Sequence, residues 1–525
     1  MLLAESHLSG LTLCSLLGSI IPSVSLDFGI RRIRIIGLRA FLTTSSYFSV
    51  SRTRSDNSTA KFQSVETIRW LPHSNINFII GTDGTLLSLA VSTMSSILIR
   101  ILVGWSSIEG FKKEYIIAFS IGESFTIAVS RMPDTSLLHV FFESVLIFMS
   151  ITIGVRGSRQ RKIRAAHQFL SHTPPGSVFM LLAISLIFFQ TGTIDLHISL
   201  TTESSEWRQI LPRLAFLASF PVKVPMVSVH IRLPEAHVEV PTAGFVISAG
   251  ILSKLGTYGF LRFSVPMFPG ATLYFTPFVY TLSVIATTYT LPTTIRQIDP
   301  KKIIAYSSVA YMNFVTTGMS SPNIQGIEGS ILPTSSHGPV LLALSSCVGA
   351  LYDRYKTRPV RYYGGPASTM PNFPTIPLLS TPANMSLPGT SSSIGEFPIL
   401  VGAFQKNSLV ATSAALGMIL GAAYPLWPHN RVVFGNSKPK FLHKFSDLNR
   451  REVLTFLPSI PGAIRMGVYP EVSLECMHTS VSNLVQHGKF SRQVIFGKLL
   501  LFRVFVLWYV GSLSFRNGIT IGKRR

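Results

Sequence analysis

Isolated charged side chains lie inside long apolar stretches of this sequence, where they could carry out proton chemistry. Glu143 lies in the run VFFESVL, and Lys223 lies in a second apolar run, between Pro221 and Pro225. The proton affinity of a carboxylate or an amine in such surroundings depends on the charges nearby. If the two form a pair, separating them changes that affinity, by about 1.36 kcal/mol per pKa unit. The pattern favours proton transfer without a redox group; a static ion pair that orients two helices is the alternative.

The two prolines beside Lys223 predict a broken helix. Proline removes a backbone donor and clashes with the preceding turn, so a helix over 208–228 must kink or end there. Within a membrane, a break is tolerated where it is buried in protein or lines a cavity. An ionisable residue beside it is a candidate for an ion pathway. A loop lysine between two ordinary helices is the competing interpretation.

Three further ionisable residues continue the series. Lys254, His337 and Glu396 lie in the apolar stretches ILSKLG, SSHGPV and SSIGEF. Glu396 follows Pro388 and Gly389, which predict a second interrupted helix. Two interrupted segments in corresponding places indicate an inverted repeat, an arrangement in which transporters build a site near the membrane midplane.

Composition indicates a membrane protein. The 525 residues are 47% hydrophobic and only 13% charged, with a mean hydropathy of +0.41, which is unlike an ordinary soluble domain. Apolar stretches near the roughly 20 residues needed to span a bilayer recur along the chain. We therefore expect one all-α polytopic unit, with spans at about 84–104, 114–132, 136–154, 168–190, 208–228, 241–263, 271–292, 301–320, 329–352, 408–427 and 451–468.

Other function classes are disfavoured. Cys14, Cys347 and Cys476 are too far apart for a disulfide framework or an iron–sulfur site. The sequence lacks a glycine-rich dinucleotide loop, so we expect this chain to bind neither NADH nor a flavin. The net charge of +23 could suit nucleic acid, but binding it requires a solvated basic face. Basic loops such as Arg156 to Arg164 instead bias orientation in a membrane.

The segment from Leu233 to Gly244 (LPEAHVEVPTAG) resembles the signature loop of NADH dehydrogenase chain 4, an antiporter-like membrane subunit of respiratory complex I. The resemblance covers about 56–490. It implies about fourteen transmembrane helices, with two inverted five-helix repeats that each contain a broken helix, in the mitochondrial inner membrane. It implies as partners the lipid bilayer and the other membrane subunits of the complex, but no nucleic acid.

The resemblance also bears on cofactors and on the alternatives. It implies that NADH, FMN, iron–sulfur clusters and ubiquinone are bound by other subunits of the complex, and none by this chain. A stand-alone cation/proton antiporter subunit and a non-functional gene copy are the alternative interpretations.

The resemblance assigns the ionisable residues to one water-connected axis along the membrane midplane. It implies Glu143 and Lys223 as the modulating pair, Lys254 and His337 as relays, and Glu396 as the connection to the outlet.

Three more positions concern the same axis. His230 and His237 match histidines that the family has near the broken helix, where proton relay and plain helix packing are both open. The family has histidine where this chain has Tyr311. A tyrosine, with an ordinary pKa near 10, exchanges protons less readily, so this relay position is in question.

Several residues do not suit their places in this comparison. Four arginines stand where the family has apolar, aromatic or cysteine residues, and two prolines fall inside apolar helices. Arginine at the membrane centre costs about 2.5–3.5 kcal/mol even on insertion scales. Most of these changes are one pyrimidine exchange from the expected codon, which suggests translation of an organellar gene before its transcript is edited; a decayed or divergent copy is the alternative. The residues are Arg100, Arg131, Arg156, Arg232, Pro339 and Pro398.

The two ends of the chain depart from the family pattern. The first 65 residues resemble a transit peptide in composition, yet their apolar runs 8–21 and 30–50 match two membrane spans of the family. At the other end, basic residues split the apolar run 494–510, which leaves an interfacial helix or read-through past an unedited stop codon. On the second reading the mature protein lacks peptides from Gln493 onward. The expected organisation is 1–65, an N-terminal transmembrane region; 66–470, an antiporter-like domain; 471–490, an amphipathic segment; and 491–525, a read-through tail.

Overall fold

The computed structural model describes residues 30–71, 76–107, 112–157, 160–202, 205–227, 229–436 and 446–490. The first apolar run, over 8–21, and the expected tail, over 491–525, lie outside the described residues.

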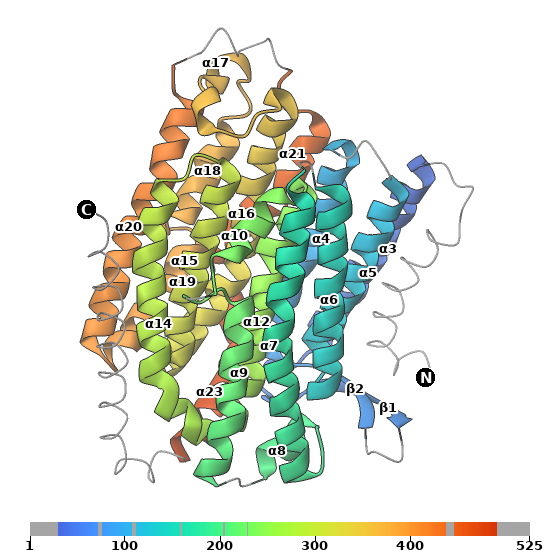
Figure 1. The fold of residues 1–525 in the computed structure, drawn as a ribbon, viewed down its shortest axis with the longest axis vertical. Helices are drawn as coiled ribbons and strands as arrows, with labels where there is room; N and C mark the ends of the chain where they lie inside the picture. Colours follow the sequence, from blue (N-terminus) through green and yellow to red (C-terminus); the bar gives the residue numbers. More distant parts are fainter. Residues whose placement is uncertain are drawn as a thin grey trace, which may run out of the picture.

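Long helices stand side by side in one bundle, with α8 and the hairpin β1–β2 at one end and α17 at the other (Figure 1). The first half contains α3 (Ile30–Arg54), α4 (Gly84–Ser107), α5 (Lys112–Arg131), α6 (Thr135–Arg156), α7 (Lys162–Thr191), α8 (Leu196–Thr201), α9 (Glu206–Lys223) and α10 (Arg232–Glu239). The second contains α14 (Pro269–Ile295), α15 (Pro300–Ser320), α16 (Ile324–Tyr355), α17 (Pro366–Thr369), α18 (Thr375–Asn384), α19 (Ser391–Phe404), α20 (Ser408–Val433), α21 (Arg450–Phe456), α22 (Ser459–Val468) and α23 (Glu471–Phe490).

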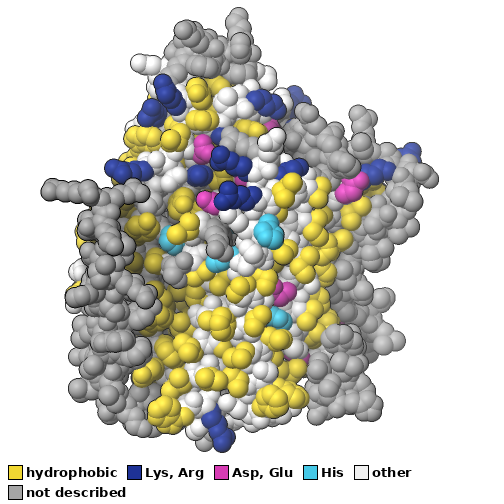
Figure 2. Space-filling model, in the orientation of Figure 1, with side chains coloured by type: hydrophobic (Ala, Val, Ile, Leu, Met, Phe, Trp, Pro, Cys, Tyr) yellow, Lys and Arg dark blue, Asp and Glu magenta, His cyan; other side chains and the backbone are white. Residues whose placement is uncertain are grey.

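The surface suits a lipid environment. Within the described residues, five helices are both long and apolar enough to cross a membrane. Hydrophobic side chains cover the middle of the face in Figure 2, while basic side chains gather toward the end that carries α17. The five helices are Thr135–Val155, Lys162–Thr191, Thr242–Met267, Ile324–Tyr355 and Ser408–Val433.

Both predicted helix interruptions are present. Helix α9 ends at Lys223, and α10 begins only at Arg232. Helix α18 ends at Asn384, and α19 begins at Ser391. In the second break Gly389 adopts a φ of 86°, a left-handed conformation that favours glycine.

The predicted span over 241–263 is continuous but irregular. It consists of α11 (Thr242–Ile247), the π-helical η2 (Ser248–Leu252), α12 (Ser253–Gly259), the π-helical η3 (Phe260–Ser264) and α13 (Val265–Met267). π-Helical segments inside α-helices are rare and occur often at functional sites. Here they flank the helical turns that carry Lys254.

Two features correct the sequence-based picture. The chain is not purely α-helical, because β1 (Gln63–Leu71) pairs antiparallel with β2 (Ile76–Thr82). Both strands are rich in β-branched and aromatic residues, which favour a pleated backbone. The single span predicted over 451–468 divides into α21 and α22 near Pro458, a residue that cannot donate to the preceding turn.

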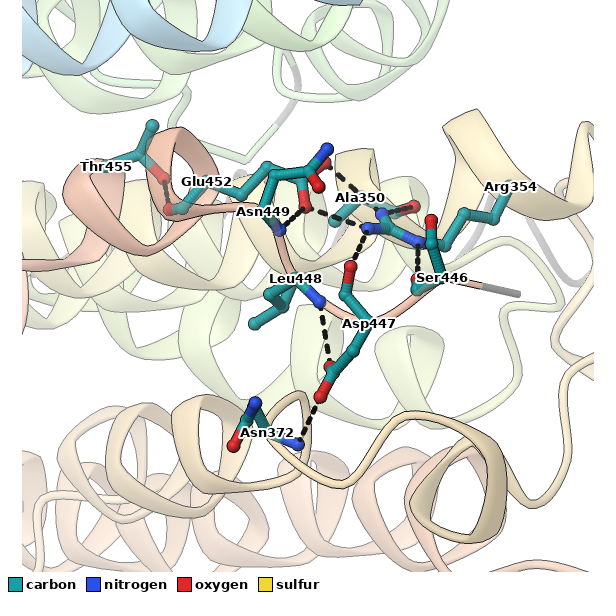
Figure 3. Close-up of polar contacts among 9 residues, drawn as sticks. All are labelled: Ala350, Arg354, Asn372, Ser446, Asp447, Leu448, Asn449, Glu452 and Thr455. Atoms are coloured by element: carbon teal, nitrogen blue, oxygen red, sulfur yellow. Dashed lines mark hydrogen bonds and ion pairs between the residues drawn. The ribbon is translucent and has the colours of Figure 1, made fainter. Parts of the chain in front are cut away.

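A polar network fastens the segment before α21 to the end of α16 (Figure 3). The Arg354 guanidinium donates to both carboxylate oxygens of Glu452, at 2.8 and 3.3 Å, and to the carbonyls of Ser446 and Asp447 at 2.9 and 3.1 Å. The Asp447 carboxylate accepts from the backbone N–H of Asn372 at 3.0 Å. Three segments distant in the sequence are thereby joined at the end of the bundle where basic side chains gather.

Candidate functional site

Glu143 and Lys223 form a direct ion pair. The Lys223 ammonium lies 3.0 Å from Glu143 Oε1, and its side chain is 2% exposed against 23% for Glu143. The ammonium also lies 3.3 Å from the centre of the Phe142 ring, a cation–π contact. The predicted pair is therefore present, and it joins α6 to the break at the end of α9.

Local sequence holds both partners in place. Asp134 caps α6 by accepting hydrogen bonds from the backbone N–H groups of Ser136 and Leu137. Gly256 on α12 lets that helix approach Lys223 closely, because a Cβ at Gly256 would lie 3.1 Å from the Lys223 Cβ and 2.8 Å from Val224. The absence of a side chain at Gly256 thus brings α12 against the broken helix.

Lys254 lies on α12, two residues before Gly256. It is 2% exposed, and its ammonium donates to the Gly250 carbonyl at 2.6 Å. A Cβ at Gly338 on α16 would lie 3.0 Å from the Lys254 nitrogen. The ammonium therefore occupies the space that a side chain at Gly338 would need, beside His337.

His337 and Tyr311 stack at the centre of the bundle. Their ring centres are 3.9 Å apart, with planes 15° from parallel. His337 has no exposed surface, and its charge would interact with that of Lys254. Neither of its ring nitrogens has a hydrogen-bond partner among the described residues. Buried polar atoms without a partner commonly mark a functional group or an ordered water.

Glu396 lies on α19 just after the second break. It is 6% exposed and accepts a hydrogen bond from the Ser386 hydroxyl. A cavity of about 40 Å³ reaches the carboxylate and is lined also by Tyr311, Asn384 and Tyr424. That volume has room for a water molecule or two.

The structure thus brings Glu143 of α6 against Lys223 of α9, and it groups Lys254 of α12, His337 of α16 and Glu396 of α19 in a second series. The contacts between neighbours run from Glu143 to Lys223, from Lys254 to the Gly338–His337 turn, and from His337 through Tyr311 toward Glu396. Tyr311 stands inside the series, where the resemblance implies a histidine.

His230 and His237 occupy a different environment. The His230 ring lies edge-on to Tyr289 at 6.0 Å, and the His237 ring edge-on to Phe245 at 5.9 Å. Both histidines are buried, and these ring contacts are those of helix packing.

Sequence reasoning missed several side chains at the site. Ser386 and Phe142 touch Glu396 and Lys223 directly. His139 is half-buried, and its charge would interact with those of Glu143 and Lys223. The sequence did contain a signal for His139, because it precedes Glu143 by four residues and so shares its helix face. For Phe142 and Ser386 no comparable signal exists, since such residues are common throughout the chain.

Comparisons with known proteins identify the family of this chain. Residues 133–421 match the family model described as NADH:quinone oxidoreductase/Mrp antiporter, TM. NADH-ubiquinone oxidoreductase chain 4 of Marchantia polymorpha is 70% identical over 485 residues, covering 92% of this chain and 98% of that protein. Its counterpart in Arabidopsis thaliana is 68% identical with the same coverage.

More distant proteins share the fold. Respiratory complex I from Thermus thermophilus with bound NADH contains a chain with a TM-score of 0.80 at 23% identity, covering 91% of this chain and 99% of that one. A chain of the Mrp complex from Dietzia sp. DQ12-45-1b gives 0.81 at 16% identity, covering 94% and 99%. The match to the family model and the identity over nearly the whole length of both plant relatives show that the chain belongs to the family of NADH-ubiquinone oxidoreductase chain 4.

Proposed function

We propose that this chain translocates protons as a core membrane subunit of NADH:ubiquinone oxidoreductase. The observation that carries the proposal is the Glu143–Lys223 ion pair, 3.0 Å long, at a helix break inside an apolar bundle. A charge pair that opens and closes changes the proton affinity of its members. This supplies the means to couple a distant reaction to proton movement.

Protons would pass along the buried axis in steps. Lys254 and His337 relay, and Glu396 connects to the outlet. The partnerless nitrogens of His337 and the cavity beside Glu396 support ordered water between these groups. We propose that His230 and His237 support the proton path by packing against aromatic rings near the broken helix.

The experiment replaces Glu143 or Lys223 by alanine in the assembled complex. We expect most coupled proton transport to be abolished, because no ion pair remains whose opening and closing changes the proton affinity of its members. Glu143→Asp should retain part of it, since a shorter carboxylate can still titrate. Proton pumping per NADH oxidised is the measurement, with assembly checked on a native gel. Full assembly with normal pumping in either alanine variant would make the pair structural only.

A proton-transfer site of this kind requires a protein that crosses the membrane many times. We propose about fourteen transmembrane helices and two inverted five-helix repeats, built around the breaks in α9–α10 and α18–α19. The basic end of the bundle then faces the matrix of the mitochondrial inner membrane, following the positive-inside rule (Figure 2). Residues 66–470 form the antiporter-like domain, preceded by 1–65 and followed by the amphipathic 471–490.

The redox reaction would take place elsewhere in the complex. We propose that NADH, FMN, iron–sulfur clusters and ubiquinone are bound by other subunits, while this chain contacts its antiporter-like neighbours and lipid. A stand-alone cation/proton antiporter is less well supported, because relatives that match nearly full length, such as those of Marchantia polymorpha and Arabidopsis thaliana, carry the name NADH-ubiquinone oxidoreductase chain 4. Co-migration of the chain with NADH dehydrogenase activity on a native gel separates the two functions.

We also propose that the sequence precedes editing of its transcript. Arg131 is 1% exposed, and none of its three side-chain nitrogens has a hydrogen-bond partner among the described residues. Arg100 is 3% exposed, with one partnerless nitrogen in that same part of the chain. The side chains of Arg156 and Arg232 lie outside the part of the chain that the structure describes. Sequencing the messenger RNA decides: codons that still specify arginine at these positions would exclude editing there.

A further inference from the structure

Asn313 lies at the centre of the bundle with no exposed surface. It stands on α15, two residues after Tyr311. Its side-chain nitrogen donates to the Val309 carbonyl in the same helix at 2.7 Å and to the Pro225 carbonyl in the α9 break at 2.9 Å. Both neighbours are acceptors only, so the nitrogen must face them and Oδ1 must point away. One amide therefore joins α15 to the broken helix.

The Pro225 carbonyl lies beyond the end of α9, where Asn313 supplies it with a donor. The N–H of Val224 donates to Phe220 at 2.9 Å, Pro225 has no N–H, and the N–H of Met226 donates to Pro221 at 3.1 Å. The chain thus leaves its helix directly after Lys223. Among the described residues, no backbone N–H donates to the Pro225 carbonyl. A buried carbonyl without a donor is costly, and Asn313 removes that cost.

We propose that Asn313 is a positioning residue that sets where the Lys223 ammonium lies relative to Glu143. Pro225 is two residues beyond Lys223, so the hydrogen bond from Asn313 to the Pro225 carbonyl, called the clamp below, fixes the backbone near Lys223. From this backbone the Lys223 ammonium reaches Glu143 at 3.0 Å. The proposal rests on the proposed function of this ion pair in proton transfer. It adds a residue that neither the charge pattern nor the helix breaks identify.

The position of the clamp also connects the two halves of the axis. Asn313 holds the α9 break, while Tyr311 on the same helix stacks on His337. A displacement of the backbone at the break would therefore also displace α15 and the Tyr311 ring beside His337. The Asn313 Oδ1 atom is buried and has no hydrogen-bond partner among the described residues, so it offers an acceptor to a water molecule next to the hinge.

The test uses the assembled complex in sealed vesicles and measures protons pumped per NADH oxidised across a pH series. Asn313→Leu keeps the number and branching of the side-chain heavy atoms but removes both donors. We expect pumping to fall at least fivefold and the pH of half-maximal pumping to shift, because the pair is no longer held at its distance. Asn313→Gln keeps the donors and should recover at least half of the pumping. Thr317→Val on the same helix is the matched control, since within the described residues its buried hydroxyl donates to the Phe314 carbonyl of its own helix.

The outcomes separate this proposal from the proposed function. Wild-type pumping and an unchanged pH profile in Asn313→Leu would overturn the clamp. So would a loss of pumping in Asn313→Leu that Asn313→Gln does not recover and that leaves the pH profile unchanged. A Glu143→Ala variant is measured in parallel, and normal pumping by that variant counts against the proposed function instead.

A variant that cannot assemble still leaves a decisive comparison. Asn313→Asp keeps the shape of the side chain but has a hydrogen-bond donor only while its carboxyl is protonated. If Asn313→Leu is absent from the complex, pumping by Asn313→Asp is expected to fall at least fivefold more than that of wild type as the pH rises. Equal pH dependence in Asn313→Asp and wild type would overturn the clamp.

Discussion

The buried guanidinium of Arg131 tests whether the chain is stable with its residues as written. Arg131 ends α5, is 1% exposed, and has three nitrogens without hydrogen-bond partners among the described residues. The Glu66 carboxylate of β1 attracts its charge. At about 1 kcal/mol for each unpartnered buried group, the lower end of the usual range, the three together cost at least about 3 kcal/mol.

Arg131→Met removes this cost with little change of shape, because methionine is unbranched and adapts to irregular spaces. We expect the free energy of unfolding to rise by about 3 kcal/mol, roughly a hundredfold in the folding equilibrium. Unfolding of the purified chain in detergent, followed by circular dichroism as the SDS fraction increases, measures the difference. Arg161→Met, at an exposed position, is the control and should change stability by no more than about 0.5 kcal/mol. Equal or lower stability of Arg131→Met would show that the guanidinium is satisfied in the folded protein and would refute the reasoning.

Three further predictions concern other parts of the chain. Glu452→Ala removes the ion pair with Arg354 and should lower the free energy of unfolding by about 1.5–3 kcal/mol in the same titration; no loss would show that the network of Figure 3 is not stabilising. Asp134→Ala should cost about 1 kcal/mol through loss of the helix cap, and Asp134→Asn less, because asparagine caps equally well. Burial raises the pKa of Asp134 above 3.8. The part of the stability that is linked to its protonation is therefore present below that value and is lost as the pH rises through the raised pKa; in Asp134→Asn this pH dependence should vanish. Tyr311→His should increase the rate of coupled pumping, because an imidazole exchanges protons near neutral pH; an unchanged rate would place the limiting step elsewhere.

The charge pair could be found from the sequence because of what a membrane excludes. Glu143 and Lys223 are isolated charges in apolar helices. Burying an unpaired charge in such surroundings costs free energy, so two charges of opposite sign are expected to form an ion pair. The helix breaks were also readable, since prolines and glycines act on the backbone locally, whatever surrounds them. The hairpin β1–β2 was missed because its short strands resemble a loop between spans when only hydropathy is considered.

Other parts of the site depend on contacts that only the tertiary structure forms. Asn313 meets Pro225 across 88 positions of sequence, and an asparagine in an apolar helix gives no sign of which distant carbonyl it will reach. The stacking of Tyr311 on His337 likewise requires α15 and α16 to pack in one particular register. Residue types and local breaks therefore determined which groups could carry protons. The packing of helices far apart in the sequence decided which of those groups touch, because hydrogen bonds and ring contacts act over only a few ångströms.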